Sequence, residues 1–204
     1  HNTQALQQMI NTTLKYNACV LLPTTLGIAF FAREIVVFLF TNAYLAAVLP
    51  LQTLLVGVAI FGTSMPVGGA LLGAGRPDLG LKLVAVAACL NVVLNIVLVP
   101  LVGIEGAAAT SALTYSLTGI VLVYLIVRVL NVSFDIRWYR NLAAVTLLVI
   151  LFFELFEFLN ERLALVILLV VYTLIVWFVF LSKSDRQNLF HIFEPDFVAR
   201  RRAR

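Results

Sequence analysis

The sequence predicts an all-helical membrane protein, built as a polytopic bundle of six transmembrane α-helices. Long stretches contain no charged residue, among them residues 35–75 and 163–182, and about 20 apolar residues suffice for a helix to cross the hydrocarbon core. Composition agrees, because 62% of the residues are hydrophobic and only 12% are charged, whereas a soluble domain has about 25% charged residues. The chain cannot form a conventional aqueous surface, which excludes most soluble enzymes.

Helices are expected rather than a barrel, because the apolar stretches are long and continuous and a helix satisfies its own backbone polar groups in lipid. In chain order the predicted spans are residues 16–40, 46–72, 83–100, 106–127, 142–159 and 164–181. They form a six-span transmembrane lobe over residues 1–182 and leave residues 183–204 as a basic cytoplasmic tail. No separate soluble domain fits.

Individual spans differ in their sequence patterns. The second is interrupted along its length by prolines and glycines, which are Pro50, Gly57, Gly62, Pro66, Gly68 and Gly69. Pro66 removes a backbone hydrogen bond deep in this span, so a kinked or broken helix is expected there. Glu105 is the only charged residue between the third and fourth spans. The uncharged run of the fifth, residues 141–153, is short and crosses the membrane only with flanking residues.

Basic residues are distributed unequally between the two ends of the predicted bundle. Only Arg33 and Arg162 fall on one side, and all other Lys and Arg residues fall on the opposite side. Since basic residues are retained in the cytoplasm, both termini are expected to be cytoplasmic in a multi-pass protein of the plasma (inner) membrane. These charges adjoin span ends, so the expected partners are membrane lipids and not nucleic acid, despite a net charge of +4.

Polar residues within the spans are the first candidates for function, because burying them in hydrocarbon costs free energy. Asn91 and Asn95 are four residues apart and share a helix face, where they either hydrogen-bond a partner helix or line a wet cavity. Small residues begin the fourth span at Gly106, and Gly69 and Gly73 end the second. This spacing predicts close backbone contacts at both places.

Motifs for enzyme chemistry are missing from the sequence. There is no Walker-type phosphate loop, no His-Glu-x-x-His motif and no Gly-x-Ser-x-Gly motif. Both histidines, His1 and His191, lie outside the predicted spans. We therefore expect no catalytic residue, no metal site and no cofactor. Because position 1 is not methionine, we also expect that the chain is not a complete gene product.

An ordered set of motifs extends over residues 14–128. It comprises Pro23 and Gly27, the segment Thr41-Asn42-Ala43-Tyr44, the loop Leu71-Leu72-Gly73-Ala74-Gly75-Arg76-Pro77, the pair Asn91 and Asn95, Pro100, and the run Gly103 to Thr110. In this order the sequence resembles the carboxy-terminal six-helix lobe of polysaccharide-biosynthesis flippases in the multidrug/oligosaccharidyl-lipid/polysaccharide exporter superfamily.

The resemblance implies a transport function. In that family two six-helix lobes face each other across a cavity and expose it alternately to each side of the membrane. The implied substrate is a lipid-linked oligosaccharide on a polyprenyl diphosphate carrier. This chain departs from the family pattern, because the amino-terminal lobe is missing and spans two to four contain no cation.

Two hypotheses follow. In the first, the chain is half of a transporter whose substrate-binding residues are Gln52, Asn91 and Asn95 in the cleft and Arg76 and Lys82 at its cytoplasmic mouth. The hinge of this transporter lobe would be Pro66, Gly68 and Gly69. In the second, the chain is a flippase-derived accessory subunit that packs against other membrane subunits without transporting anything.

Overall fold

A computed structural model of the chain describes residues 3–133, 136–156 and 161–176, and in these ranges it is helical without a β-strand. The α-helices are α1 (Thr3–Phe30), α2 (Ala32–Phe40), α3 (Val48–Ser64), α4 (Gly69–Gly73), α5 (Pro77–Val102), α6 (Ile104–Leu130), α7 (Ile136–Phe156) and α8 (Glu161–Ile175). Two 3₁₀ helices join them, η1 (Asn42–Ala47) and η2 (Met65–Gly68). The predicted tail, residues 183–204, lies outside the described residues.

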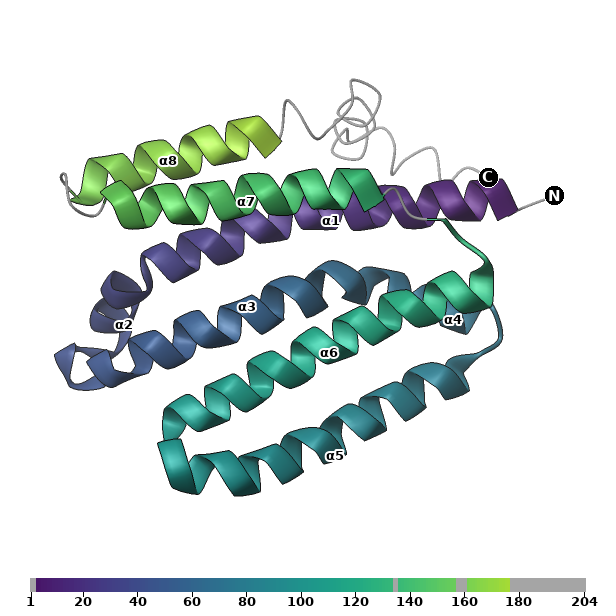
Figure 1. The fold of residues 1–204 in the computed structure, drawn as a ribbon, viewed down its shortest axis with the longest axis horizontal. Coiled ribbons are helices and arrows are strands. Elements are labelled where there is room, and N and C mark those ends of the chain that lie inside the picture. Colours follow the sequence, from purple (N-terminus) through teal and green to yellow (C-terminus); the bar gives the residue numbers. More distant parts are fainter. Residues whose placement is uncertain (1–2, 134–135, 157–160, 177–204) are drawn as a thin grey trace, which may run out of the picture.

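The long helices lie side by side and alternate in direction (Figure 1). Helix α3 packs between α1 and α6, and α5 lies at the edge of the bundle against α6, while α7 and α8 lie on the α1 side. The α4–α5 connection and the end of α6 lie near the amino-terminal end of α1, whereas α2, η1 and the α5–α6 turn lie at the other end (Figure 1). The described helices therefore form antiparallel hairpins.

Three helical stretches in the described ranges are long and apolar enough to cross a membrane: Asn42–Gly73, Pro77–Val102 and Ile104–Leu130. A fourth span results if Leu6–Phe30 and Ala32–Phe40 count together. The predicted spans 142–159 and 164–181 extend into residues 157–160 and 177–204, which lie outside the described part. Six spans therefore remain a prediction, and the structure supports three or four.

The first predicted span, residues 16–40, is not one continuous helix. The helix begins at Thr3, and its direction changes by 68° after Phe30. Phe31 leaves the helical conformation there, with φ −95° and ψ 18°. The predicted interruption of the second span is confirmed, because a 3₁₀ turn containing Pro66 separates α3 from α4. Proline lacks the N–H that would continue the α-helical ladder.

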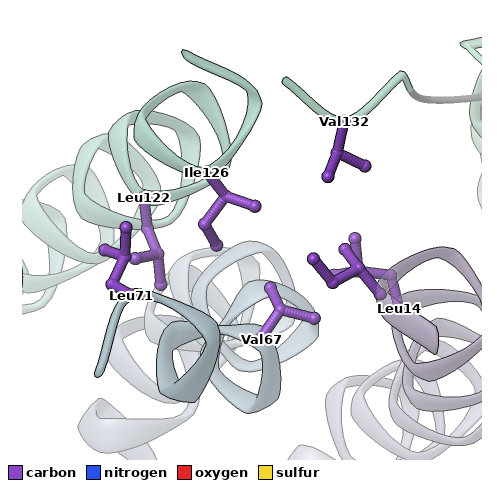
Figure 2. Close-up of a cluster of buried hydrophobic side chains, with 7 residues drawn as sticks. Leu14, Val67, Leu71, Leu122, Ile126 and Val132 are labelled. Atoms are coloured by element: carbon purple, nitrogen blue, oxygen red, sulfur yellow. The ribbon is translucent and has the colours of Figure 1, made fainter. Parts of the chain in front are cut away.

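Two clusters of buried side chains hold the helices together. One joins α1 to α7 and α8 through Ala18, Cys19, Leu142, Val149, Tyr172 and Val176. The other joins α1, η2, α4, α6 and the segment after α6 through Ile10, Leu14, Val67, Leu71, Leu122, Ile126 and Val132 (Figure 2). Val67 and Leu71 are almost completely buried. The broken end of the second span is therefore anchored in a packed core.

Candidate functional site

Helices α3 and α6 approach each other closely at two glycines, Gly57 and Gly119. A Cβ atom on Gly57 would lie 2.6 Å from the Cα atom of Ala112, and one on Gly119 would lie 3.0 Å from the Cα atom of Phe61. Cβ atoms essentially never come within 3.0 Å of other heavy atoms, so only glycine fits at position 57, and at position 119 a side chain would fit only if its neighbours shifted slightly. The two backbones are thus in direct contact, a packing that small residues permit within a membrane.

The predicted close contacts of small residues are confirmed in one place and wrong in the other. At the α5–α6 turn, a Cβ atom on Gly106 would lie 2.6 Å from the carbonyl oxygen of Leu98. Around Gly69 and Gly73 no atom lies within 4 Å of a built Cβ. Leu71, which lies between the two glycines in sequence, packs in the core. The opposite side of the short α4 helix, which carries Gly69 and Gly73, therefore faces outward. The two glycines therefore face away from any neighbouring helix.

Asn91 and Asn95 connect α5 to α6 by hydrogen bonds. The Asn91 side-chain amide donates to Thr114 Oγ1 at 3.0 Å, and the Asn95 amide donates to Asn91 Oδ1 and to the Asn91 carbonyl, both at 2.9 Å. All three side chains are buried or half-buried. Of the two alternatives for this pair, the structure shows the interhelical bond, and a cavity-lining role stays a prediction.

Gln52 lies at a different helix interface. Its side-chain amide donates to the carbonyl oxygen of Ala29 at 3.0 Å. Ala29 belongs to the last turn of α1, where helix carbonyls lack an intrahelical partner. Gln52 therefore caps α1 directly before the bend at Phe31. The structure does not bring Gln52 into hydrogen-bond contact with Asn91 or Asn95, because its partner is α1 and theirs is α6 or α5 itself.

Asn17 of α1 bonds α3 in the same way that Gln52 of α3 bonds α1. It was not among the predicted site residues. Its side-chain amide donates to the carbonyl oxygens of Gly62 and Thr63 in α3. In a continuous helix the Gly62 carbonyl would accept from residue 66, which is a proline without an N–H. Asn17 supplies the missing donor, as a neighbouring side chain must in lipid. The position of Pro66 four residues after Gly62 was the available signal, but the sequence does not show which helix lies opposite.

The cations Arg76 and Lys82 flank a single carboxylate at the start of α5. Arg76 Nε lies 3.2 Å from Asp78 Oδ1, and Lys82 Nζ lies 3.7 Å from Asp78 Oδ2. All three side chains are largely exposed, so water screens these ion pairs and they contribute little to stability. Two positive charges against one negative leave a net charge of +1, which favours an anionic ligand or lipid headgroup.

The predicted hinge residues lie in and after η2. Pro66 is exposed, and a Cβ atom on Gly68 would make an ordinary contact of 3.6 Å with Leu122. Gly69 has open space around it. Neither glycine is required by close packing, so their hinge role stays a prediction. Among the described residues, no group of three or more His, Cys, Asp or Glu side chains is placed to hold a metal ion.

Comparison with known proteins finds a similarity to the uncharacterized membrane protein MJ1068 of Methanocaldococcus jannaschii. The two are 31% identical over 132 residues, which are 64% of this chain and 26% of that protein. The chain thus spans about a quarter of the length of the curated relative it matches. No family model matches. No solved structure matches either.

The relative's description as a membrane protein agrees with the long apolar helices described above. This chain is a helical membrane protein. The likeness does not extend to an activity, because nothing beyond membrane location is stated of the relative.

Proposed function

We propose that this chain is one lobe of a transporter that moves a lipid-linked oligosaccharide, on a polyprenyl diphosphate carrier, between the two leaflets by alternating access. The observation that carries the proposal is the 3₁₀ turn at Pro66 that interrupts the α-helical hydrogen bonding between α3 and α4, where a side chain of the neighbouring α1 satisfies the Gly62 and Thr63 carbonyls. Transporters commonly build their substrate and ion sites from discontinuous helices of this kind.

The relation to a longer membrane protein supports a lobe rather than a whole transporter. The matched stretch is about a quarter of the relative, so a protein of that length has room for a second lobe of similar size. The cavity would then lie between two lobes. In this proposal Pro66, Gly68 and Gly69 form the hinge of this lobe.

The diphosphate of the carrier would meet Arg76 and Lys82 at the cytoplasmic mouth. Both cations are exposed and share only one carboxylate, so an anionic ligand can replace Asp78 as their partner at little cost. Gln52, Asn91 and Asn95 would line the cleft when the helices that they now join move apart.

Leaflet transfer in vesicles tests this function. The protein is reconstituted with any further lobe encoded in the same gene, and transfer of a fluorescent polyprenyl diphosphate sugar is followed. The double variant R76Q/K82Q is expected to slow transfer at least tenfold, whereas R140Q, at another exposed cation on the same end of the bundle, leaves it within twofold. Unchanged transfer in R76Q/K82Q would remove the anion role. Unchanged transfer in Q52A/N91A/N95A would remove the cleft role of the amides.

A second candidate is an accessory subunit of a larger membrane complex. Helix α5 favours it, because it contains no fully buried residue and contacts mainly α6. Its apolar outer face is long enough to pack against another transmembrane helix. This candidate predicts stable copurification with other subunits in mild detergent and no leaflet transfer, and isolation as a monomer would contradict it.

A further inference from the structure

The segment formed by α2 and η1 bends away from α1 and exposes large apolar side chains. Helix α2 is turned by 68° from α1, although α1 runs along the long axis of the bundle (Figure 1). The large apolar side chains at the end of α2 and in η1 are exposed, namely Phe38, Leu39, Phe40, Tyr44 and Leu45. Phe38 has the highest exposed fraction of these, at 88%.

One side of α2 is nevertheless packed. Ala32 and Val36, one turn apart, are 0% and 4% exposed, so this face fixes the helix against the bundle. The charged residues Arg33 and Glu34 are exposed near its beginning. Helix α2 thus has a fixed inner face and an outer surface that changes from charged to apolar along its length.

The position of the bend along α1 keeps this surface close to the acyl chains. The charge-free part of α1 begins after Lys15, and from there to Phe30 a helix rises about 22 Å at 1.5 Å per residue. The hydrocarbon core is about 30 Å thick. Helix α1 therefore turns before it has left the membrane. The bond from Gln52 to Ala29 places the start of α3, and with it η1, beside the same bend.

The residue types fit the boundary between headgroups and acyl chains. Phenylalanine and leucine insert below the headgroups, tyrosine prefers the interface, and charged residues reach the headgroup region. Phe40 and Tyr44 also contact each other, with ring centroids 5.8 Å apart. Exposure of these five apolar side chains to water would cost free energy in proportion to their area. Continuity with the lipid-facing spans on both sides makes phospholipid their partner.

The geometry points to a lipid-binding interfacial element: residues 32–47 lie along the membrane surface, with Phe38, Leu39, Phe40, Tyr44 and Leu45 embedded in phospholipid, instead of completing a straight first span. This inference does not depend on the transport function. It replaces the outer end of the predicted first span and its connection to the second span with a membrane-anchored segment.

Site-directed spin labelling in phosphatidylcholine/phosphatidylglycerol vesicles tests this inference. Exposed Cys89 is first replaced by Ala, and the parent carrying only buried Cys19 serves as the unlabelled control. Single cysteines are then placed at Arg33, Val37, Phe38, Phe40 and Tyr44. Accessibility to oxygen and to a water-soluble nickel complex gives the depth of each label. We expect Phe38, Phe40 and Tyr44 labels at a similar shallow depth in lipid, and the Arg33 label in contact with water.

Three results would overturn the inference. A straight span would give a steady change in depth of about 1.5 Å per residue from position 33 to position 40. An aqueous loop would make all the labels accessible to nickel. A protein partner on this surface would protect the labels at Phe38 and Tyr44 from both reagents. Helical circular dichroism and monodispersity of each variant confirm that it is folded.

Discussion

The two interfaces of α6 show different ways of holding helices together in lipid. Against α3, the contact is steric: Gly57 and Gly119 let the two backbones come close together. Against α5, away from the turn at Gly106, the contact includes a chain of amides from Asn95 through Asn91 to Thr114. Because lipid tails are as apolar as leucine, neither interface gains much from hydrophobic burial. Shape therefore secures one side of α6, and hydrogen bonds contribute to the other.

The steric interface should be the more sensitive to substitution. Gly57→Ala is expected to destabilise the protein by about 1–3 kcal/mol, because overpacking forces the helices apart. The matched control is Gly69→Ala, where the added methyl group meets nothing within 4 Å and the helix propensity of alanine is favourable. Thermal unfolding in detergent measures both. Equal unfolding midpoints for the two variants would contradict the tight contact between α3 and α6.

The stability of the interrupted turn after α3 should depend on a hydrogen bond from Asn17 of α1. Asn17→Ala leaves the Gly62 carbonyl without its donor and is expected to cost about 1–2 kcal/mol. In a Pro66→Ala background the backbone N–H of residue 66 becomes available, so the same substitution should cost less. A double-mutant cycle measured by denaturant unfolding gives the coupling. Additive effects would show that Asn17 does not substitute for the donor that proline lacks.

The amide contact between α5 and α6 should show the smallest effect. Asn91→Ala is expected to cost about 0.6 kcal/mol, the average for a polar contact between membrane helices. Thr114→Val removes the bond to Asn91 from the other side, so the double variant should lose less than the sum of the two single variants. Unfolding in detergent provides the comparison. If Asn91→Ala lowered the free energy of unfolding by more than about 2 kcal/mol, this interface would be as sensitive to substitution as the α3–α6 contact, against the prediction.

Much of the architecture could be predicted because it depends on local sequence. Charge-free runs identify the helices, Pro66 lacks a donor wherever it lies, and glycine at position 106 permits a close turn. The bend at Phe31 had no such signal, because neither proline nor glycine occupies that position and the residues on both sides are apolar. In a helix that is apolar all round, periodicity does not show which side is packed.

The candidate site could be predicted less well because it depends on which helices are neighbours. The sequence shows that Gln52 and Asn91 are polar, but the partner of each side chain is set by helix packing. Gln52 meets the end of α1, and Asn91 meets Thr114. The sequence shows Asn17 only as one of several polar residues in the spans, and its role depends on α1 lying beside the turn at Pro66. A transport role for any of these residues stays a proposal.

The reciprocal amides of α1 and α3 have a consequence for biogenesis. Each helix contains a break, and each break is completed by an amide from the other helix: Asn17 serves α3, and Gln52 serves α1. A helix released singly from the insertion machinery would carry an unpaired carbonyl into hydrocarbon. We expect the two to leave the translocon together, with crosslinks between them forming on ribosome-bound chains that already contain α3. The first hairpin would then be the smallest unit that the membrane accepts during synthesis.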